Sequence, residues 1–283
     1  MKTYVVPGGT TGMGRGLARH FLRRGDQVTI IGSDPAKGRR FLDEAARAGA
    51  GDQAAFLQAD LTSVAENVRV IKEITARHDA LDGLVLTAMR HFPGRVVTPD
   101  GFEATFALYY VSRMLLSYGL TGLLEKGANP MIVSVCGVGV TKGRIDWDDL
   151  SLKHGFGRIK AVLQGGRATD LLGVAYAANH PDGRTRFLLH HPGFTDSGTD
   201  SLGQPAKVVL KVLARFFAQP VEKSIEPIIE LMDDPPGRGL LAYDRRAPVD
   251  PSLPTLDPDD APPVRADRPP AAVTLSTPRS GPC

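Results

Sequence analysis

Short apolar runs alternate with longer stretches of helical periodicity through the first 245 residues of the chain. The short runs are rich in Val, Ile, Leu or Phe and are bounded by Gly, Asp or Pro, which is typical of buried strands. They cover residues 3–7, 27–32, 54–60, 82–88, 130–137, 184–190 and 239–244. Apolar residues recur at helical spacing over residues 15–25, 36–49, 65–78, 101–126 and 161–180.

Strand and helix in regular alternation predict a parallel sheet with helices on both faces. Strands that are buried on both faces are uniformly apolar, as these are. We therefore predict an α/β fold, a doubly wound parallel sheet in a single domain of three layers.

The composition changes near the carboxyl end. Residues 235–283 contain more than half of the 22 prolines and few large apolar side chains. Such a segment lacks the apolar surface that would offset the entropy of ordering it. We predict that residues 246–283 form a proline-rich, disordered tail, with a rigid functional arm as the alternative.

Charge and cysteine content argue against several classes of protein. The formal net charge is only +3 over 283 residues, without a block of Lys or Arg, so nucleic acid is not an expected partner. Cys136 and Cys283 cannot build a disulfide framework and indicate a reducing compartment. No run approaches the ~18 consecutive apolar residues of a membrane span. We expect a cytoplasmic protein without a membrane partner.

Three glycines, Gly8, Gly12 and Gly14, lie between the first predicted strand and the first predicted helix. Glycine suits a place where the chain turns sharply and its backbone approaches a pyrophosphate, which the amides of the helix N-terminus then attract. A tight structural turn needs the same residues, so the loop alone is a weak indication.

The loop resembles the Thr-Gly-x-x-x-Gly-x-Gly motif of the short-chain dehydrogenase/reductase family, with Pro7 in place of the threonine. In QADLTS, the resemblance assigns Asp60 to the adenine amine and Leu61 to the side of the ring. A helix cap is the alternative for Asp60. HHPGFTDS is similar to the family's Pro-Gly turn beside the nicotinamide and places Pro192 and Gly193 there. RIDWDDL resembles an insert of the retinol-dehydrogenase-like branch.

These motifs are colinear over residues 3–245. They imply a Rossmann-type dinucleotide-binding domain over residues 1–245, with a substrate lid near residues 195–232. They also imply a small-molecule substrate, no metal, and a homodimer or homotetramer, in which Arg113 and Asp170 could pair across the interface. The cofactor residues are Gly8, Thr10, Thr11, Gly12, Met13, Gly14, Ser33, Lys37, Asp60, Leu61, Thr87, Ala88, Pro192 and Gly193.

The end of the second predicted strand favours NADP(H) over NAD(H). NAD-specific members carry an acidic side chain there, which binds the ribose hydroxyls and repels a 2′-phosphate. Here Gly32 and Ser33 occupy the discriminating positions, and Lys37 and Arg39 follow. These basic residues could equally form a solvated helix face.

The family's catalytic residues are absent from the matching positions. Gly137 stands where the resemblance expects the serine, and Tyr109 where it expects the asparagine. The tyrosine and lysine fall either on Val162 and Gly166 or, in a second alignment, on Leu163 and Arg167. No tyrosine lies between residues 118 and 176, so neither alignment supplies an acid. Tyr109 and Arg113 have the required spacing, but they lie on an earlier helix, where aromatic packing is the favoured interpretation.

Two residues are candidates for a rebuilt site. Arg167 could hold the nicotinamide ribose in the second alignment, although arginine does not release a proton. Cys136 could be a reactive thiol, although small buried packing is the favoured interpretation. Gly165 and Gly166 each cost roughly 1 kcal/mol relative to alanine in a helix. That cost predicts close approach of a ligand or another helix.

Three functions follow as hypotheses. The first is an atypical NADP(H)-dependent oxidoreductase that acts on an apolar carbonyl or alcohol with a non-standard proton donor. The second is a non-redox cyclase, isomerase or lyase on the same scaffold, ranked nearly level with the first. The third is a nucleotide-binding pseudoenzyme, because a fold does not by itself determine a function.

Overall fold

The computed structural model describes residues 1–140, 143–193 and 220–260. Within them an eight-stranded sheet has the order β3-β2-β1-β4-β5-β6-β7-β8. Strands β1 to β7 are parallel, and the short β8 is antiparallel to β7. The strands are β1 Thr3–Pro7, β2 Gln27–Gly32, β3 Ala54–Gln58, β4 Gly83–Leu86, β5 Met131–Val135, β6 Arg186–His191, β7 Leu240–Asp244 and β8 Ala247–Pro248.

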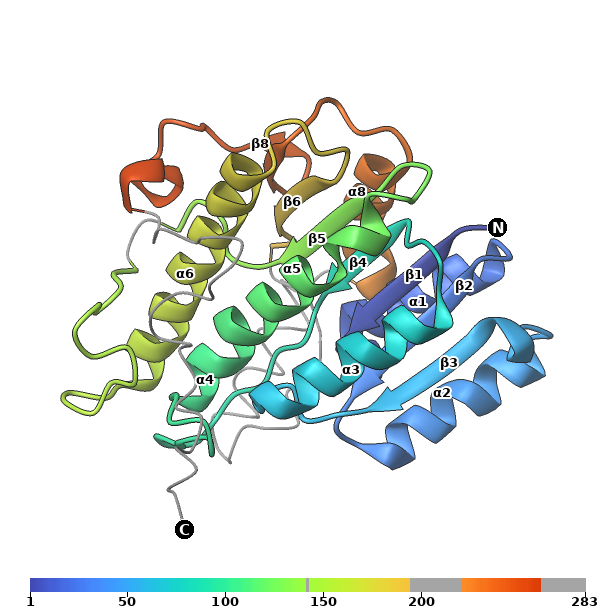
Figure 1. Cartoon of the computed structure of the whole chain (residues 1–283), viewed down its shortest axis with the longest axis horizontal. Helices are drawn as coiled ribbons and strands as arrows, with labels where there is room; N and C mark the ends of the chain where they lie inside the picture. Colours follow the sequence, from blue (N-terminus) through green and yellow to red (C-terminus); the bar gives the residue numbers. More distant parts are fainter. Residues whose placement is uncertain (141–142, 194–219, 261–283) are drawn as a thin grey trace, which may run out of the picture.

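Helices cover both faces of this sheet and confirm the predicted three-layer α/β fold (Figure 1). Helices α1, α2 and α8 pack on one face, and α3, α5 and α6 on the other. The helices are α1 Gly12–Arg23, α2 Pro35–Arg47, α3 Val64–Arg77, α4 Ala104–Phe106, α5 Ser112–Leu124, α6 Arg158–Asn179 and α8 Val221–Asp233. Short 3-10 helices span η1 Gly51–Gln53, η3 Pro254–Leu256 and η4 Pro258–Asp260, and a π-helix spans η2 Ala107–Val111.

Alternation along the strands explains why both faces are apolar. In β1, Val5 belongs to the core cluster under α3, α5 and α6, whereas Tyr4 and Val6 belong to the cluster under α1, α2 and α8. Successive side chains of a strand point to opposite faces, so a strand between two helical layers is apolar throughout. Burying each such side chain contributes about 1.5–3 kcal/mol to folding.

The direction in which the chain adds strands to the sheet reverses between β1 and β4. The chain moves outward from β1 to β2 and β3 on one side, and continues through β4, β5, β6 and β7 on the other. Loops that leave β1 and β4 therefore diverge at the carboxyl edge of the sheet, which is where open α/β sheets bind their ligands.

The region predicted as one helix over residues 101–126 is divided in the structure. Residues 104–106 form α4, the π-helix η2 follows, and α5 begins at Ser112. Apolar periodicity does not reveal such a local change of winding, because the same residues remain buried.

Residues 246–260 differ from the predicted disordered tail. They include β8, η3 and η4, and Thr255 and Leu256 are buried. Thr255 donates a hydrogen bond to Asp170 of α6, and Leu256 packs in the core cluster on that face. These contacts supply the stabilisation that the local composition lacks. Residues 261–283 lie outside the described residues.

The predicted lid over residues 195–232 is described only from residue 220 onwards. Its apolar stripe in α8 is core packing, because Ile225, Ile228 and Met232 are buried with α1. A Cβ added to Gly16 of α1 would lie 2.7 Å from the Val221 side chain, which shows how closely the two helices approach.

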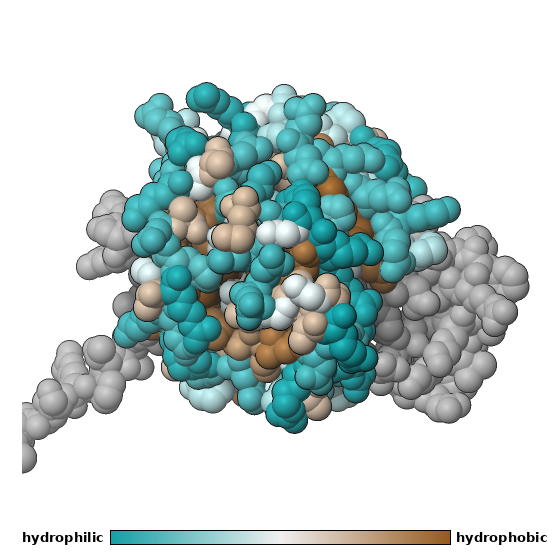
Figure 2. Space-filling model, turned by 90° about the vertical axis from the view of Figure 1, so that its right-hand side faces the viewer, coloured by the Kyte–Doolittle hydropathy of each residue, from teal (hydrophilic) through white to brown (hydrophobic). Residues whose placement is uncertain are grey.

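Polar side chains cover most of the face that Figure 2 shows, and apolar side chains are visible between them. Among the helices of the described residues, none has the length and apolar character that crossing a bilayer requires.

Candidate functional site

The loop after β1 forms a tight cradle against β4. Gly8 has φ +84°, and a Cβ there would lie 2.5 Å from the backbone nitrogen of Ala88. A Cβ on Gly14 would collide with Thr87 Oγ1 and the Gly8 carbonyl oxygen. Thr87 Oγ1 donates to the Pro7 carbonyl oxygen at 2.8 Å and ties the two strand ends together. Only glycine fits at these two positions.

The first turn of α1 has no capping side chain. Thr11 is the N-cap residue in an extended conformation, makes no side-chain cap hydrogen bond and is exposed. In contrast, Asp34 caps α2 and Ser63 caps α3. Uncapped amides at the positive end of a helix suit a phosphate group. Cradle and helix end together fit the pyrophosphate of a dinucleotide.

The end of β2 carries the predicted discriminating residues. The Thr10 side chain packs closely on Gly32, because a Cβ added to Gly32 would lie 2.8 Å from Thr10 Cγ2. Ser33 and Lys37 are exposed. Asp34 Oδ1 accepts from the backbone nitrogens of Ala36 at 2.9 Å and Lys37 at 3.1 Å, which lowers the pKa of Asp34. Its carboxylate is therefore engaged in capping α2.

Asp60 lies after β3 and does not cap a helix. Asp60 Oδ1 accepts from the backbone nitrogen of Thr62 at 3.0 Å and from Thr62 Oγ1 at 2.8 Å, whereas Ser63 is the N-cap residue of α3. The alternative assignment of Asp60 as a cap is therefore wrong. Asp60 is exposed, and Leu61 is buried in the core.

A largely buried polar cluster joins Cys136, which follows β5, to α6 and η3. Cys136 Sγ lies 3.8 Å from Asp170 Oδ1, and Thr255 Oγ1 donates to Asp170 Oδ2 at 2.5 Å. Burial, followed by the Asp170 charge, raises the pKa of the Cys136 thiol. A thiol that stays protonated is a poor nucleophile, which favours the packing interpretation of Cys136.

Asp170 is a buried acid that the sequence patterns did not identify as part of the site. Burial raises its pKa to about 7, against the hydrogen bond from Thr255, which lowers it. Arg113 is also buried, and its Nη1 donates to Ser134 Oγ at 2.7 Å and to the Val135 carbonyl oxygen at 2.9 Å. Arg113 and Asp170 are both buried and hydrogen-bonded to residues of their own chain. They are therefore not on a surface where they could pair across a subunit interface, contrary to the prediction.

Two positions that the resemblance matches to catalytic residues, Gly137 for the serine and Gly166 for the lysine in the first alignment, have room for side chains. A Cβ on Gly137 would meet only Val140, at 3.6 Å, and a Cβ on Gly166 would meet no atom within 4 Å. Gly166 lies one turn before Asp170, so it shares the face of α6 that contacts Cys136 at the end of β5. This geometry favours the alignment of the catalytic pair with Val162 and Gly166.

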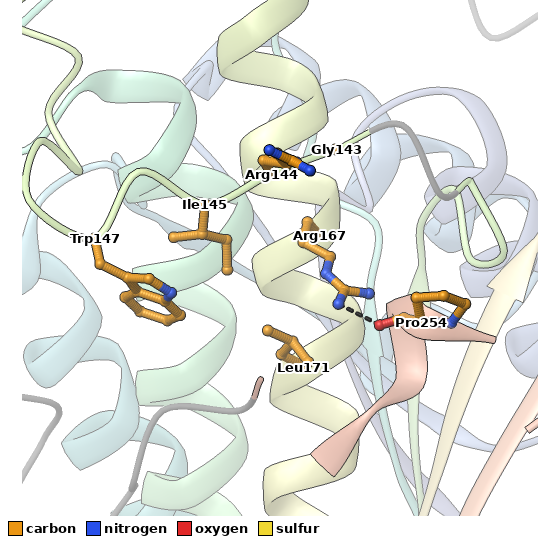
Figure 3. Close-up of a pocket in the computed structure, with 7 residues that line it drawn as sticks. All are labelled: Gly143, Arg144, Ile145, Trp147, Arg167, Leu171 and Pro254. Atoms are coloured by element: carbon orange, nitrogen blue, oxygen red, sulfur yellow. Dashed lines mark hydrogen bonds between the residues drawn. The ribbon is translucent and has the colours of Figure 1, made fainter. Parts of the chain in front are cut away.

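Arg167 lies on a neighbouring face of α6 and lines a pocket of about 430 Å³. Figure 3 shows its side chain extending toward Pro254, whose carbonyl oxygen accepts a hydrogen bond from Arg167 Nη2. The other lining residues are Gly143, Arg144, Ile145, Trp147 and Leu171, which include the first part of the RIDWDDL insert.

The Pro-Gly turn follows β6. Gly193 has φ +73°, and a Cβ there would lie 3.2 Å from Arg245 Cδ. His190, two residues before the turn's proline, is fully buried with Nε2 3.0 Å from the Arg245 carbonyl oxygen. The strands thus bring Pro192, Gly193, Thr87, Ala88 and the glycine loop to one edge of the sheet.

Known proteins are similar to this chain in sequence and in fold. Residues 2–148 match the family model described as short chain dehydrogenase. The chain is 30% identical over 223 residues to Oxidoreductase AN1596 of Emericella nidulans, covering 77% of this chain and 66% of that protein. It is 28% identical over 237 residues to polyprenol dehydrogenase of Mus musculus, covering 78% of this chain and 67% of that protein. The matches thus span about two thirds of these relatives' length.

A solved structure supports the same fold. The short chain dehydrogenase from Shigella flexneri complexed with NADP superposes with a TM-score of 0.66 at 18% identity, covering 87% of this chain and 97% of that chain. With a family model that matches more than half of the sequence and a doubly wound sheet of the same type, the chain belongs to the short-chain dehydrogenase family.

Proposed function

We propose that the protein is an NADP(H)-dependent oxidoreductase that interconverts an apolar carbonyl compound and its alcohol, using a proton donor other than the family's tyrosine. The observation that carries this proposal is the cradle in which Gly8 and Gly14 contact the end of β4 beside the uncapped start of α1. The close packing of this turn would require glycine with or without a ligand, so the support for nucleotide binding comes from the turn together with the uncapped amides of α1.

Different residues at the carboxyl edge of the sheet bind different parts of the nucleotide. The amides of the loop from Gly8 to Gly14 bind the pyrophosphate, and Asp60 binds the adenine amine. Thr87 and Ala88, with Pro192 and Gly193, border the nicotinamide. When bound, the reduced nicotinamide supplies a hydride to the carbonyl carbon.

The preference for NADP(H) is supported by charge. No carboxylate stands free at the end of β2 in the described residues, because Asp34 is turned into the first turn of α2. Ser33 can donate to a 2′-phosphate, and Lys37 adds a positive charge, although its Nζ also lies 3.9 Å from Asp34 Oδ2. An ion pair this long and exposed contributes little and leaves the lysine available to a phosphate.

An apolar substrate is supported by the named activity of a relative. Polyprenol dehydrogenase, which aligns with this chain over 237 residues, is named after an apolar alcohol. A cytoplasmic location and a homodimeric or homotetrameric assembly remain predictions of the sequence.

A pair of variants at the helix start tests nucleotide binding. Thr11→Asp should weaken NADPH binding by about 100-fold or more, because the carboxylate would stand where the pyrophosphate binds, a loss of roughly 3 kcal/mol. Thr11→Asn has the same shape without the charge and should bind NADPH far better. Both are good N-cap residues, so both should be as stable as the wild type or up to about 1 kcal/mol more stable. Fluorescence titration with NADPH and NADH measures both affinities.

Turnover decides between the rival functions. Stopped-flow absorbance of the nicotinamide band with a panel of apolar ketones and aldehydes should show nucleotide oxidation. Binding of NADPH without oxidation by any carbonyl would favour a non-redox catalyst or a nucleotide-binding pseudoenzyme. Failure to bind either nucleotide would remove the oxidoreductase and the nucleotide-binding pseudoenzyme and leave only the non-redox catalyst.

A further inference from the structure

The π-helix η2 brings a tyrosine to the side of α6. Tyr109 lies in its centre, and a Cβ added to Gly165 would lie 3.1 Å from Tyr109 Cβ and 3.3 Å from Cδ2. Thr169 Oγ1 donates to the Tyr109 carbonyl oxygen at 2.7 Å and joins the two helices one turn farther on. Single-turn π-helices are often found at functional sites. The missing side chain at Gly165 therefore makes room for the Tyr109 ring.

The Tyr109 hydroxyl lies at the carboxyl edge of the sheet. It donates to the Arg90 carbonyl oxygen at 3.4 Å, longer than the 2.5–3.0 Å of an ordinary hydroxyl hydrogen bond. Arg90 follows Thr87 and Ala88, which border the glycine cradle. The hydroxyl is thus weakly engaged and lies near the strand end where the nicotinamide is proposed to bind.

Burial and nearby charged groups determine whether the Tyr109 hydroxyl keeps its proton. Burial raises the pKa of Tyr109 to about 12, and Glu103 adds to this, whereas the Arg113 charge lowers it. Arg113 lies one turn later on α5, is buried, and its Nε has no hydrogen-bond partner in the described structure. The hydroxyl therefore keeps its proton at neutral pH, and a positive charge stands ready to stabilise the tyrosinate that forms when the proton leaves.

Resting on the function proposed above, we propose that Tyr109 is the catalytic residue that replaces the family's tyrosine, with Arg113 as its positioning and charge-stabilising partner. In the reductive direction the bound nicotinamide would supply the hydride to the carbonyl carbon, and the Tyr109 hydroxyl would donate its proton to the carbonyl oxygen. The Tyr109 anion then takes a proton from water. Oxidation of the alcohol runs through the same steps in reverse.

The adjacent tyrosine provides a matched control. Tyr110 is as buried as Tyr109, but its hydroxyl has no hydrogen-bond partner within the described residues, and its ring packs 5.1 Å from that of Phe106. Tyr109→Phe should lower kcat by about 100-fold or more, in the range of a lost general acid, with NADPH affinity little changed. Tyr110→Phe should retain kcat within about threefold, because no catalytic hydroxyl is lost.

A second measurement does not depend on turnover. The chain has six tyrosines, and incorporation of 3-fluorotyrosine gives each a ¹⁹F resonance, which single Tyr→Phe variants assign. The resonance that is absent from Tyr109→Phe should shift as NADP⁺ saturates the protein, and the shift should exceed that of the Tyr110 resonance. A Tyr109 resonance that stays in place while NADP⁺ binds, or full kcat in Tyr109→Phe, would overturn this assignment and leave the proposed oxidoreductase intact. Absence of nucleotide binding by the wild type would instead overturn the proposed function.

Discussion

Two buried ionisable side chains pull the pH dependence of stability in opposite directions. Burial raises the pKa of Asp170 to about 7, so between pH 4 and 7 the folded protein binds more protons at this group than the unfolded chain. Stability from Asp170 is therefore full at low pH and is lost as pH rises through this window. Burial lowers the pKa of His190 to about 4, so its contribution is full above the unfolded value of 6.5 and is lost as pH falls toward 4.

Because the two pH windows overlap, the free energy of unfolding of the wild type should change little with pH between about 4 and 6.5. Removing one group at a time should reveal the pH dependence that the other group causes. In Asp170→Asn the free energy of unfolding should rise by about 2–3 kcal/mol from pH 4.5 to 6.5, since only His190 still titrates. In His190→Gln it should fall over the same interval. Urea denaturation at several pH values measures both slopes. Parallel curves for the two variants would contradict the assignment.

At the scale of one helix, α6 contains two adjacent glycines that serve different ends. Gly165 admits the Tyr109 ring, which confirms the expectation that another helix approaches closely there. Gly166 has no neighbour within 4 Å of an added Cβ, so packing does not explain its missing side chain. A helix gains about 0.5–1 kcal/mol when alanine replaces glycine at an unstrained position.

Alanine substitutions in α6 should therefore have opposite signs. Gly166→Ala should raise the free energy of unfolding by about 0.5–1 kcal/mol through the lower entropy of the unfolded chain. Gly165→Ala gains the same term, but the new methyl must displace Tyr109 at 3.1 Å, and overpacking of this kind costs about 1–3 kcal/mol. The net change should be zero or destabilising. Equal stabilisation of both variants by chemical denaturation would show that the ring does not press on Gly165.

At the scale of the whole molecule, residues 246–260 complete the layer that holds α6. Leu256 is 5% exposed within the core cluster, whereas Leu253 in the preceding turn is only partly buried. Arg167 and Asp170 both contact this segment, which ties the carboxyl region to the side of the candidate site.

If this segment belongs to the core, Leu256→Ala should lower the free energy of unfolding by about 2–3 kcal/mol, near the lower end of the range for a buried leucine. The matched variant Leu253→Ala removes the same atoms from a more exposed place and should cost less than about 1 kcal/mol. Both should unfold in a single transition monitored by circular dichroism. A small and equal effect of the two substitutions would mean that the segment does not contribute to the core.

The glycine loop and the alternation of strands and helices were predictable because each depends on neighbours in sequence. The residues themselves also showed that no tyrosine lies between Tyr118 and Tyr176, the stretch that includes both alignments of the catalytic pair. Boundaries differed by a few residues, as in α6, which begins at Arg158 rather than residue 161. The π-helix could not be predicted, because the apolar pattern of residues 101–126 is compatible with an ordinary helix.

By itself, then, the sequence determined the layers, the order of strands and helices along the chain and the tight glycine turn after the first strand, since periodicity and residue type act over short distances. Only the tertiary structure decided which distant side chains lie against one another. Tyr109 meets Gly165, and Thr255 meets Asp170, 85 residues away, because sheet order and helix packing bring distant segments into contact. Burial then changes what these groups do, since desolvation sets the protonation of Asp170 and Tyr109 and no local pattern records it.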